Sequence, residues 1–90
     1  MSDQEILQIL KMDLQISTDK QDSYLSALIT TAKEFIQKEG VTLTDSVEDG
    51  MLAEMYAAYL HRKRREAAPM PDMIRWNLTN RLLSEKGREK

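Results

Sequence analysis

The chain has 90 residues, of which 31% are charged, with no cysteine, one histidine, three glycines and two prolines. This length fits one small domain. The absence of cysteine excludes disulfides and thiolate metal sites, and the few turn-forming residues exclude a hairpin-rich all-β fold. No apolar run is long enough to span a membrane, and the first residues lack the basic-then-apolar order of a signal peptide. We therefore expect an intracellular all-α protein, a small bundle of three to four helices.

The charge is distributed unevenly along the chain. Residues 1–55 carry eleven acidic and four basic side chains, a balance of −7, whereas residues 56–90 carry nine basic and four acidic ones, a balance of +5. A chain with one acidic and one basic half can attract copies of itself or turn its basic face to nucleic acid. Because so small a domain has a small hydrophobic core and no disulfide bond, we expect it to oligomerise.

The first two predicted helices are amphipathic. Residues 3–12 place Ile6, Leu7 and Leu10 on one face, and Ser2 or Asp3 is expected to cap this helix. A second helix of about 20 residues is expected to start at residues 17–19, because the apolar side chains after it recur at i, i+3, i+4 and i+7. Gly40 is expected to end that helix in a left-handed conformation.

A third helix is expected after a short connector at residues 41–43, with Thr44 as its cap. Its apolar residues form two adjacent ridges, which predicts a central helix that contacts partners on two sides. Gly50 within it indicates close packing, and Pro69 implies an end near Ala68. The two ridges are Val47, Met51, Met55 and Tyr59, and Leu52, Tyr56 and Leu60.

A fourth helix is expected from Asp72 to Gly87, after an elbow at Pro69 and Pro71. We interpret residues 1–68 as a helical core domain and residues 69–90 as a C-terminal interface helix of the same domain, hinged at Pro69/Pro71. Aromatic, Met and Arg side chains are enriched at protein interfaces, so we favour a protein interface here over stacking of bases on Trp76. The residues expected in this interface are Ile74, Trp76, Leu78, Arg81 and Leu82.

The strongest local charge feature is a basic run at the end of the third helix, Arg62, Lys63, Arg64 and Arg65. Three interpretations stay open. The cations can form a solvated face that complements the negative end of the helix dipole, pair with the acidic half of another subunit, or contact nucleic-acid phosphates. Charge runs by themselves have low specificity.

No combination of residues indicates catalysis. The acids of the 19–22 and 45–49 segments are expected to serve helix starts, and Glu54 with His61 does not complete a metal-ligand set. Motifs for nucleophilic, phosphate-binding or metalloprotease chemistry are absent from the sequence. We therefore expect no enzyme activity, no catalytic residue, no metal and no cofactor.

Three segments together carry a family resemblance. Residues 22–36 follow the pattern D-x-x-L-x-x-L-I-x-x-A-x-x-x-I, residues 59–64 read Y-L-H-R-K-R, and residues 70–82 read M-P-x-M-I-R-W-x-L-x-N-R-L. Over roughly residues 12–85 the chain resembles the small head–tail connector proteins of tailed bacteriophages, often called phage DNA-packaging proteins.

The resemblance implies a structural protein without catalytic residues. It implies an all-helical subunit of a ring, dodecameric on the portal protein, that docks beneath the portal vertex of the filled capsid. Such a ring extends the DNA channel, passes DNA without sequence-specific contact, and offers a platform to the next head-completion or tail protein. The implied location is the virion head–tail junction, with the host cytoplasm during assembly and no membrane contact.

Two other functions compete with this interpretation. One is a small helical DNA-binding protein, such as a terminase small subunit or a helix-turn-helix regulator. It requires an exposed, polar recognition helix, whereas the third helix is apolar on two sides and basic only at its end. The other is a regulatory adaptor that binds a host protein through its C-terminal helix.

Overall fold

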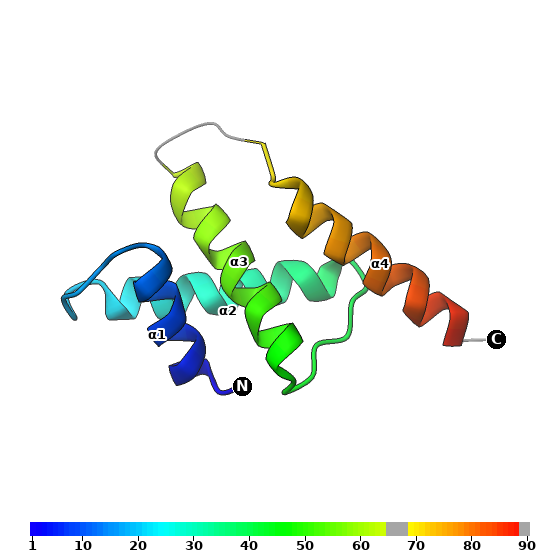
Figure 1. Cartoon of the computed structure of the whole chain (residues 1–90), viewed down its shortest axis with the longest axis horizontal. Coiled ribbons are helices and arrows are strands. Elements are labelled where there is room, and N and C mark those ends of the chain that lie inside the picture. Colours follow the sequence, from blue (N-terminus) through cyan, green and yellow to red (C-terminus); the bar gives the residue numbers. More distant parts are fainter. Residues whose placement is uncertain (65–68, 89–90) are drawn as a thin grey trace.

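The structure is a computed structural model, which describes the backbone of residues 1–64 and 69–88 and the side chains of residues 1–64 and 69–84. It contains α1 (Asp3–Asp13), α2 (Asp22–Lys38), α3 (Val47–Lys63) and α4 (Asp72–Arg88), with no strand in those ranges (Figure 1). The predicted all-α class is confirmed.

α1 begins with reciprocal capping. The Ser2 hydroxyl accepts from the backbone N–H of Glu5 at 3.2 Å, and the Glu5 carboxylate accepts from the backbone N–H of Ser2 at 3.0 Å. This capping box satisfies two amide groups that the helix itself cannot. The predicted cap at Ser2 is therefore confirmed.

The expected start of the second helix at residues 17–19 is wrong, because α2 begins at Asp22 after Gln21, which makes no side-chain cap. Lys11 explains the shift. Its ammonium lies 2.9 Å from the carboxylates of both Asp19 and Asp22, so these acids tie the connecting segment to α1. An ion pair with the preceding helix thus replaces the local cap that the sequence indicates.

Two turn predictions have different outcomes. Gly40 follows the end of α2 with a φ of 101°, so the predicted left-handed glycine is confirmed. The predicted cap at Thr44 is wrong, since the Ser46 hydroxyl caps α3 by accepting from the Asp49 N–H at 3.1 Å. Thr44 binds the Asp49 carboxylate instead, through its backbone N–H at 2.6 Å and its hydroxyl at 2.8 Å.

α3 is the central helix, as predicted, and it packs against α1, α2 and α4. Its buried surface differs from the expected ridges, because Val47 is 65% exposed and Met51 and Met55 are only half-buried. Small buried residues let the neighbouring helices approach α3 closely: Ala53, Ala57 and Ala58. Close packing at Gly50 is confirmed, since a Cβ there would lie 2.6 Å from Met1 Sδ.

The core joins all four helices. Its largest fully buried side chains are Ile6, Leu10, Leu25, Ile29, Ile36 and Val41, and α4 adds Ile74 and Leu78. Burial of each such side chain contributes about 1.5–3 kcal/mol. The hydrophobic effect therefore holds α4 against the other helices through one of its faces.

α4 begins at Asp72 as predicted, but it includes Gly87 and runs to Arg88, so the predicted end at Gly87 is wrong. A helical glycine costs about 1 kcal/mol relative to alanine, which does not suffice to end a helix. The expected end of the third helix near Ala68 lies outside the described residues. The hinge at Pro69/Pro71 and the division at residue 68 stay predictions.

Candidate interaction surfaces

α4 presents apolar side chains on two opposite faces. Ile74 and Leu78 are buried against the core, and Leu82 is half-buried beside them. On the outer face Met73 is 64% exposed and Trp76 is 71% exposed. Of the five residues predicted to form a protein interface, Trp76 alone is exposed in the folded chain, and that interface stays a prediction.

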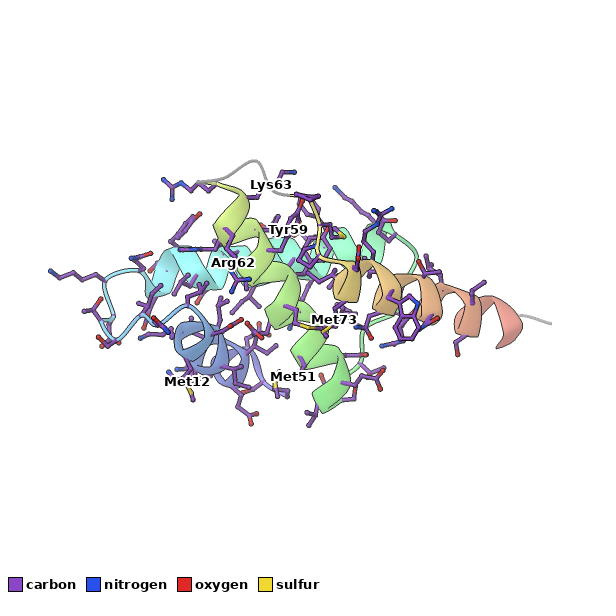
Figure 2. The ribbon with its side chains drawn as sticks, turned by 45° about the horizontal axis from the view of Figure 1, so that its top comes forward. Met12, Met51, Tyr59, Arg62, Lys63 and Met73 are labelled. Carbon is purple, nitrogen blue, oxygen red and sulfur yellow. The ribbon has the colours of Figure 1, made fainter. Side chains whose placement is uncertain are left out.

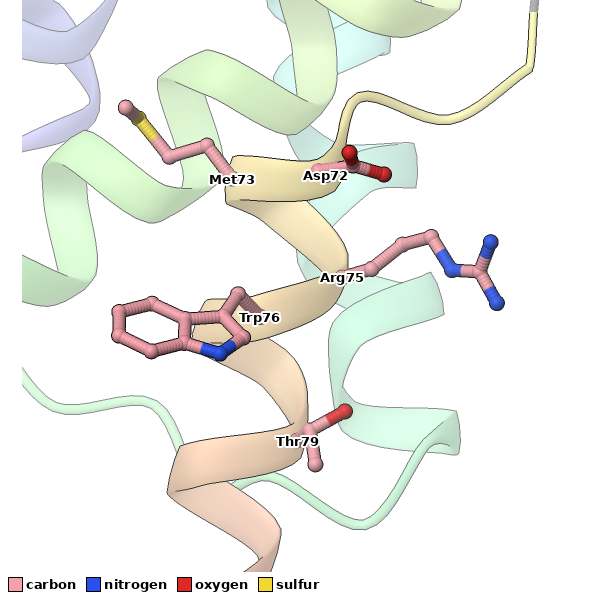
Figure 3. A pocket seen from close by; sticks show the side chains of 5 residues that line it. All are labelled: Asp72, Met73, Arg75, Trp76 and Thr79. Carbon is pink, nitrogen blue, oxygen red and sulfur yellow. The ribbon is translucent and has the colours of Figure 1, made fainter.

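The outer face of α4 contains an open hollow of about 580 Å³. Figure 3 shows the Trp76 indole and the Met73 side chain on one side of the helix and the Arg75 guanidinium on the other. Aromatic, Met and Arg side chains are the types enriched at protein interfaces. The described residues that line the hollow are Asp72, Met73, Arg75, Trp76 and Thr79.

Arg81 fastens α4 to the start of α3. Its guanidinium pairs with the carboxylate of Asp49, which is 3% exposed, and donates to the Thr42 carbonyl oxygen at 3.0 Å. Burial by itself raises the pKa of Asp49, but hydrogen bonds from Arg81 and Thr44 outweigh it and hold that pKa below its usual value. Arg81 therefore makes an internal contact in the folded chain.

The basic run lies at the C-terminal end of α3, where Figure 2 shows Arg62 and Lys63. Lys63 lies 5.9 Å from the centre of the Tyr59 ring, and the Arg64 guanidinium lies 5.0 Å from the centre of the Tyr24 ring. Such cation–π contacts hold a cation in place without neutralising it. Arg62, Lys63 and Arg64 are all exposed, and Arg65 lies outside the described residues.

A buried carboxyl group of α3, that of Glu54, lies next to the exposed Asp13 of α1. Glu54 is 3% exposed, and its Oε2 has no hydrogen-bond partner in the described part of the chain. Burial, a hydrogen bond to Asp13 and the charge of Asp13 raise the pKa of Glu54 to about 8, against a smaller opposing effect of Arg62. Glu54 therefore holds a proton at neutral pH.

Neither the Asp49–Arg81 pair nor the burial of Glu54 was predicted from the sequence. Asp49 lies in the first turn of a helix, where an acid is expected for local reasons, and its partner is 32 positions away. The residues around Glu54, from Met51 to Leu60, are apolar, but their spacing does not say whether this carboxyl faces the core or the solvent. The three-dimensional contacts alone identify these groups.

Two further observations concern metal binding and membrane crossing. Within the residues whose side chains are described, no group of three or more His, Cys, Asp or Glu residues could hold a metal ion. None of the described helices combines the length and apolar character that crossing a membrane requires.

Comparison with known protein families gives a match. Residues 4–68, more than two thirds of the chain, match the family model described as phage gp6-like head-tail connector protein. No curated protein and no solved structure matches the chain. The match covers α1 to α3 and stops before Pro69, so the segment 70–82 that contributes to the resemblance lies outside it.

Proposed function

This chain belongs to the phage gp6-like head-tail connector family, and from that premise we propose that it forms a homo-oligomeric ring beneath the portal vertex. Membership of a structural connector family supports a role at the head–tail junction of the virion, with portal and tail proteins as partners. In the proposal the ring is dodecameric, extends the DNA channel after packaging and offers a platform to the next tail protein. Copies of this chain are located in the host cytoplasm during assembly.

The observation that carries the proposal is the outer face of α4. Met73, Trp76 and Leu83 lie at helical spacings of three and seven and are all more than 60% exposed. One exposed apolar residue is ordinary, but a stripe of three with a large aromatic is typical of an interaction site. We therefore propose that this stripe is the contact to the portal protein or to the next connector.

The competing function, sequence-specific DNA binding, is less favoured by the geometry. A recognition helix must expose the side chains near its N-terminus to the bases. α3 packs against three other helices, and Asp49 in its first turn is buried in an ion pair. The basic run at the opposite end of α3 is suited to a phosphate backbone or an acidic protein surface.

The proposal is tested with Trp76→Ser added to DNA-filled capsids that carry the portal but lack this chain. A tryptophan at the centre of an interface contributes about 2 kcal/mol or more, which is about thirtyfold in affinity. We expect the variant to lose its binding to capsids, measured as copies that co-sediment with the particles.

Met12→Ser is the matched control, because Met12 is 78% exposed and lies on α1, away from the stripe. We expect this variant to bind like the wild-type chain, and both variants to keep their free energy of unfolding within about 0.5 kcal/mol. Binding of Trp76→Ser at the wild-type level would contradict the proposal for α4.

A further inference from the structure

The start of α3 lies in an acidic surface. The Met1 ammonium donates to the Asp45 carbonyl oxygen, and the Met1 side chain packs on Gly50, so the first residues of α1 and α3 lie side by side. The surface that we name the acidic end consists of four exposed side chains, Asp3, Glu5, Asp45 and Glu48. Two cations lie among these four acids, Lys33 on Asp3 and the Met1 ammonium, so negative charge is in excess.

The other end of α3 has the opposite charge. We name Arg62, Lys63 and Arg64 the basic end, and all three are exposed. Asp13 lies 3.9 Å from Arg62 and offsets part of the charge. Lys63 and Arg64 rest on tyrosine rings instead of carboxylates. A guanidinium held over an aromatic ring still has N–H groups that can donate to carboxylates.

The two ends cannot neutralise each other within one molecule. α3 has 17 residues, so they are about 25 Å apart along its axis. Charges are screened over about 8 Å at physiological ionic strength. Each end can therefore pair with a second molecule. Helix dipoles favour acids at the starts of α1 and α3 and cations at the end of α3, but each acts within one turn and leaves the excess charge of each end exposed.

We propose that the basic end of one copy binds the acidic end of the next copy. This inference rests on the proposed ring and deepens it by naming the two surfaces that meet. A contact between two different surfaces of the same chain repeats from copy to copy and closes into a ring when the rotation permits. Val47, 65% exposed between Asp45 and Glu48, adds an apolar side chain to the acidic end.

Charge reversal in both directions tests the pairing. One variant, Arg62→Glu/Lys63→Glu/Arg64→Glu, has two acidic ends, and the other, Asp45→Lys/Glu48→Lys, has two basic ends. We expect each alone to associate at least about tenfold more weakly than the wild-type chain, since like charges then meet. We expect an equimolar mixture to regain association, because the two variants can alternate around a ring.

The measurement is light scattering of the full chain at low and high salt, repeated as copies bound to portal-bearing capsids. The control is Glu34→Lys/Lys38→Glu, which swaps two exposed charges on α2 and is expected to behave like the wild type. Wild-type association by both reversal variants would overturn the inference, as would failure of the mixture to recover. Loss of duplex DNA binding in the first variant, with normal association of both, would assign the basic end to DNA and also overturn it.

The outcomes separate this inference from the proposed function. If wild-type chains associate through these ends but do not bind capsids, the pairing stands and the connector proposal fails. If wild-type chains and both reversal variants join capsids equally, the connector proposal stands and the pairing fails. If the wild-type chain neither associates nor binds capsids, both fail.

Discussion

α1 to α3 and α4 use their apolar residues differently. The first three helices surround a continuous core and are the part that matches the connector family. α4 contributes Ile74 and Leu78 to that core, yet it exposes Met73, Trp76 and Leu83 on its other side. A helix with apolar residues on both faces is suited to join its own domain to another molecule. We therefore propose that α1 to α3 form the folding unit and that α4 is the contact element.

The largest effect is expected in the core of the first three helices. Leu25 is fully buried, and replacing a buried leucine with alanine costs about 2–5 kcal/mol. We expect Leu25→Ala to lower the free energy of unfolding by that amount, measured in urea. The matched change Leu83→Ala, at an exposed position of α4, is expected to stay within about 0.5 kcal/mol. Equal losses of stability from Leu25→Ala and Leu83→Ala would contradict the difference between the first three helices and α4.

A smaller effect is expected where α4 joins the core. Arg81→Met leaves the Asp49 carboxylate buried without its cation, which costs about 3–5 kcal/mol at fully buried sites. Because the Arg81 side chain is 23% exposed and Thr44 still binds Asp49, we expect about 2 kcal/mol. The control Arg75→Met changes an exposed arginine of the same helix and is expected to be nearly neutral.

Hydrogen exchange locates the effect of Arg81→Met. We expect the amides of α4 to exchange faster in this variant while those of α2 stay protected, because the pair fastens α4 alone. Uniform loss of protection in all helices would show that α4 and the first three helices unfold as one unit and would contradict the separation.

The buried Glu54 predicts a pH dependence within the first three helices. Its pKa rises from 4.5 to about 8 in the folded chain, so the folded state keeps a proton that the unfolded state releases. The stabilisation is complete below about pH 4.5 and is lost as the pH rises through 8. We expect stability to fall by on the order of 1 kcal/mol per pH unit between about pH 6 and 8.

Glu54→Gln removes this proton while keeping the size of the side chain. We expect it to flatten the decline of stability with pH and to be more stable than the wild-type chain at about pH 9. The measurement is urea unfolding across the pH range. If the stability of the variant still falls with pH as steeply as that of the wild-type chain, other ionisable groups cause the fall.

Much of the fold could be predicted from the sequence because amphipathic spacing depends on local pattern alone. The four helices, the cap at Ser2 and the left-handed Gly40 all follow from residues within one or two turns. The start of α2 and the role of Thr44 could not be predicted in this way, since Lys11 and Asp49 recruit residues that local rules assign to capping. Contacts with other parts of the fold therefore determine which of two possible hydrogen-bond partners each of these side chains takes.

The surfaces were harder to predict than the helices. Trp76 was predicted at an interface together with Ile74 and Leu78, but the structure turns the latter two inward. Their spacing on the helix does not say which of two apolar stripes faces the core. Which stripe faces the core depends on the apolar surface that α2 and α3 leave uncovered. That surface is known only once the helices are packed together.

The most direct test is a cryo-electron microscopy structure of the head–tail junction in mature virions. We expect density for this chain in a ring adjoining the portal, with the outer face of α4 in contact with a neighbouring protein and Trp76 buried there. A junction without this chain, or a ring in which Trp76 still faces solvent, would contradict the account.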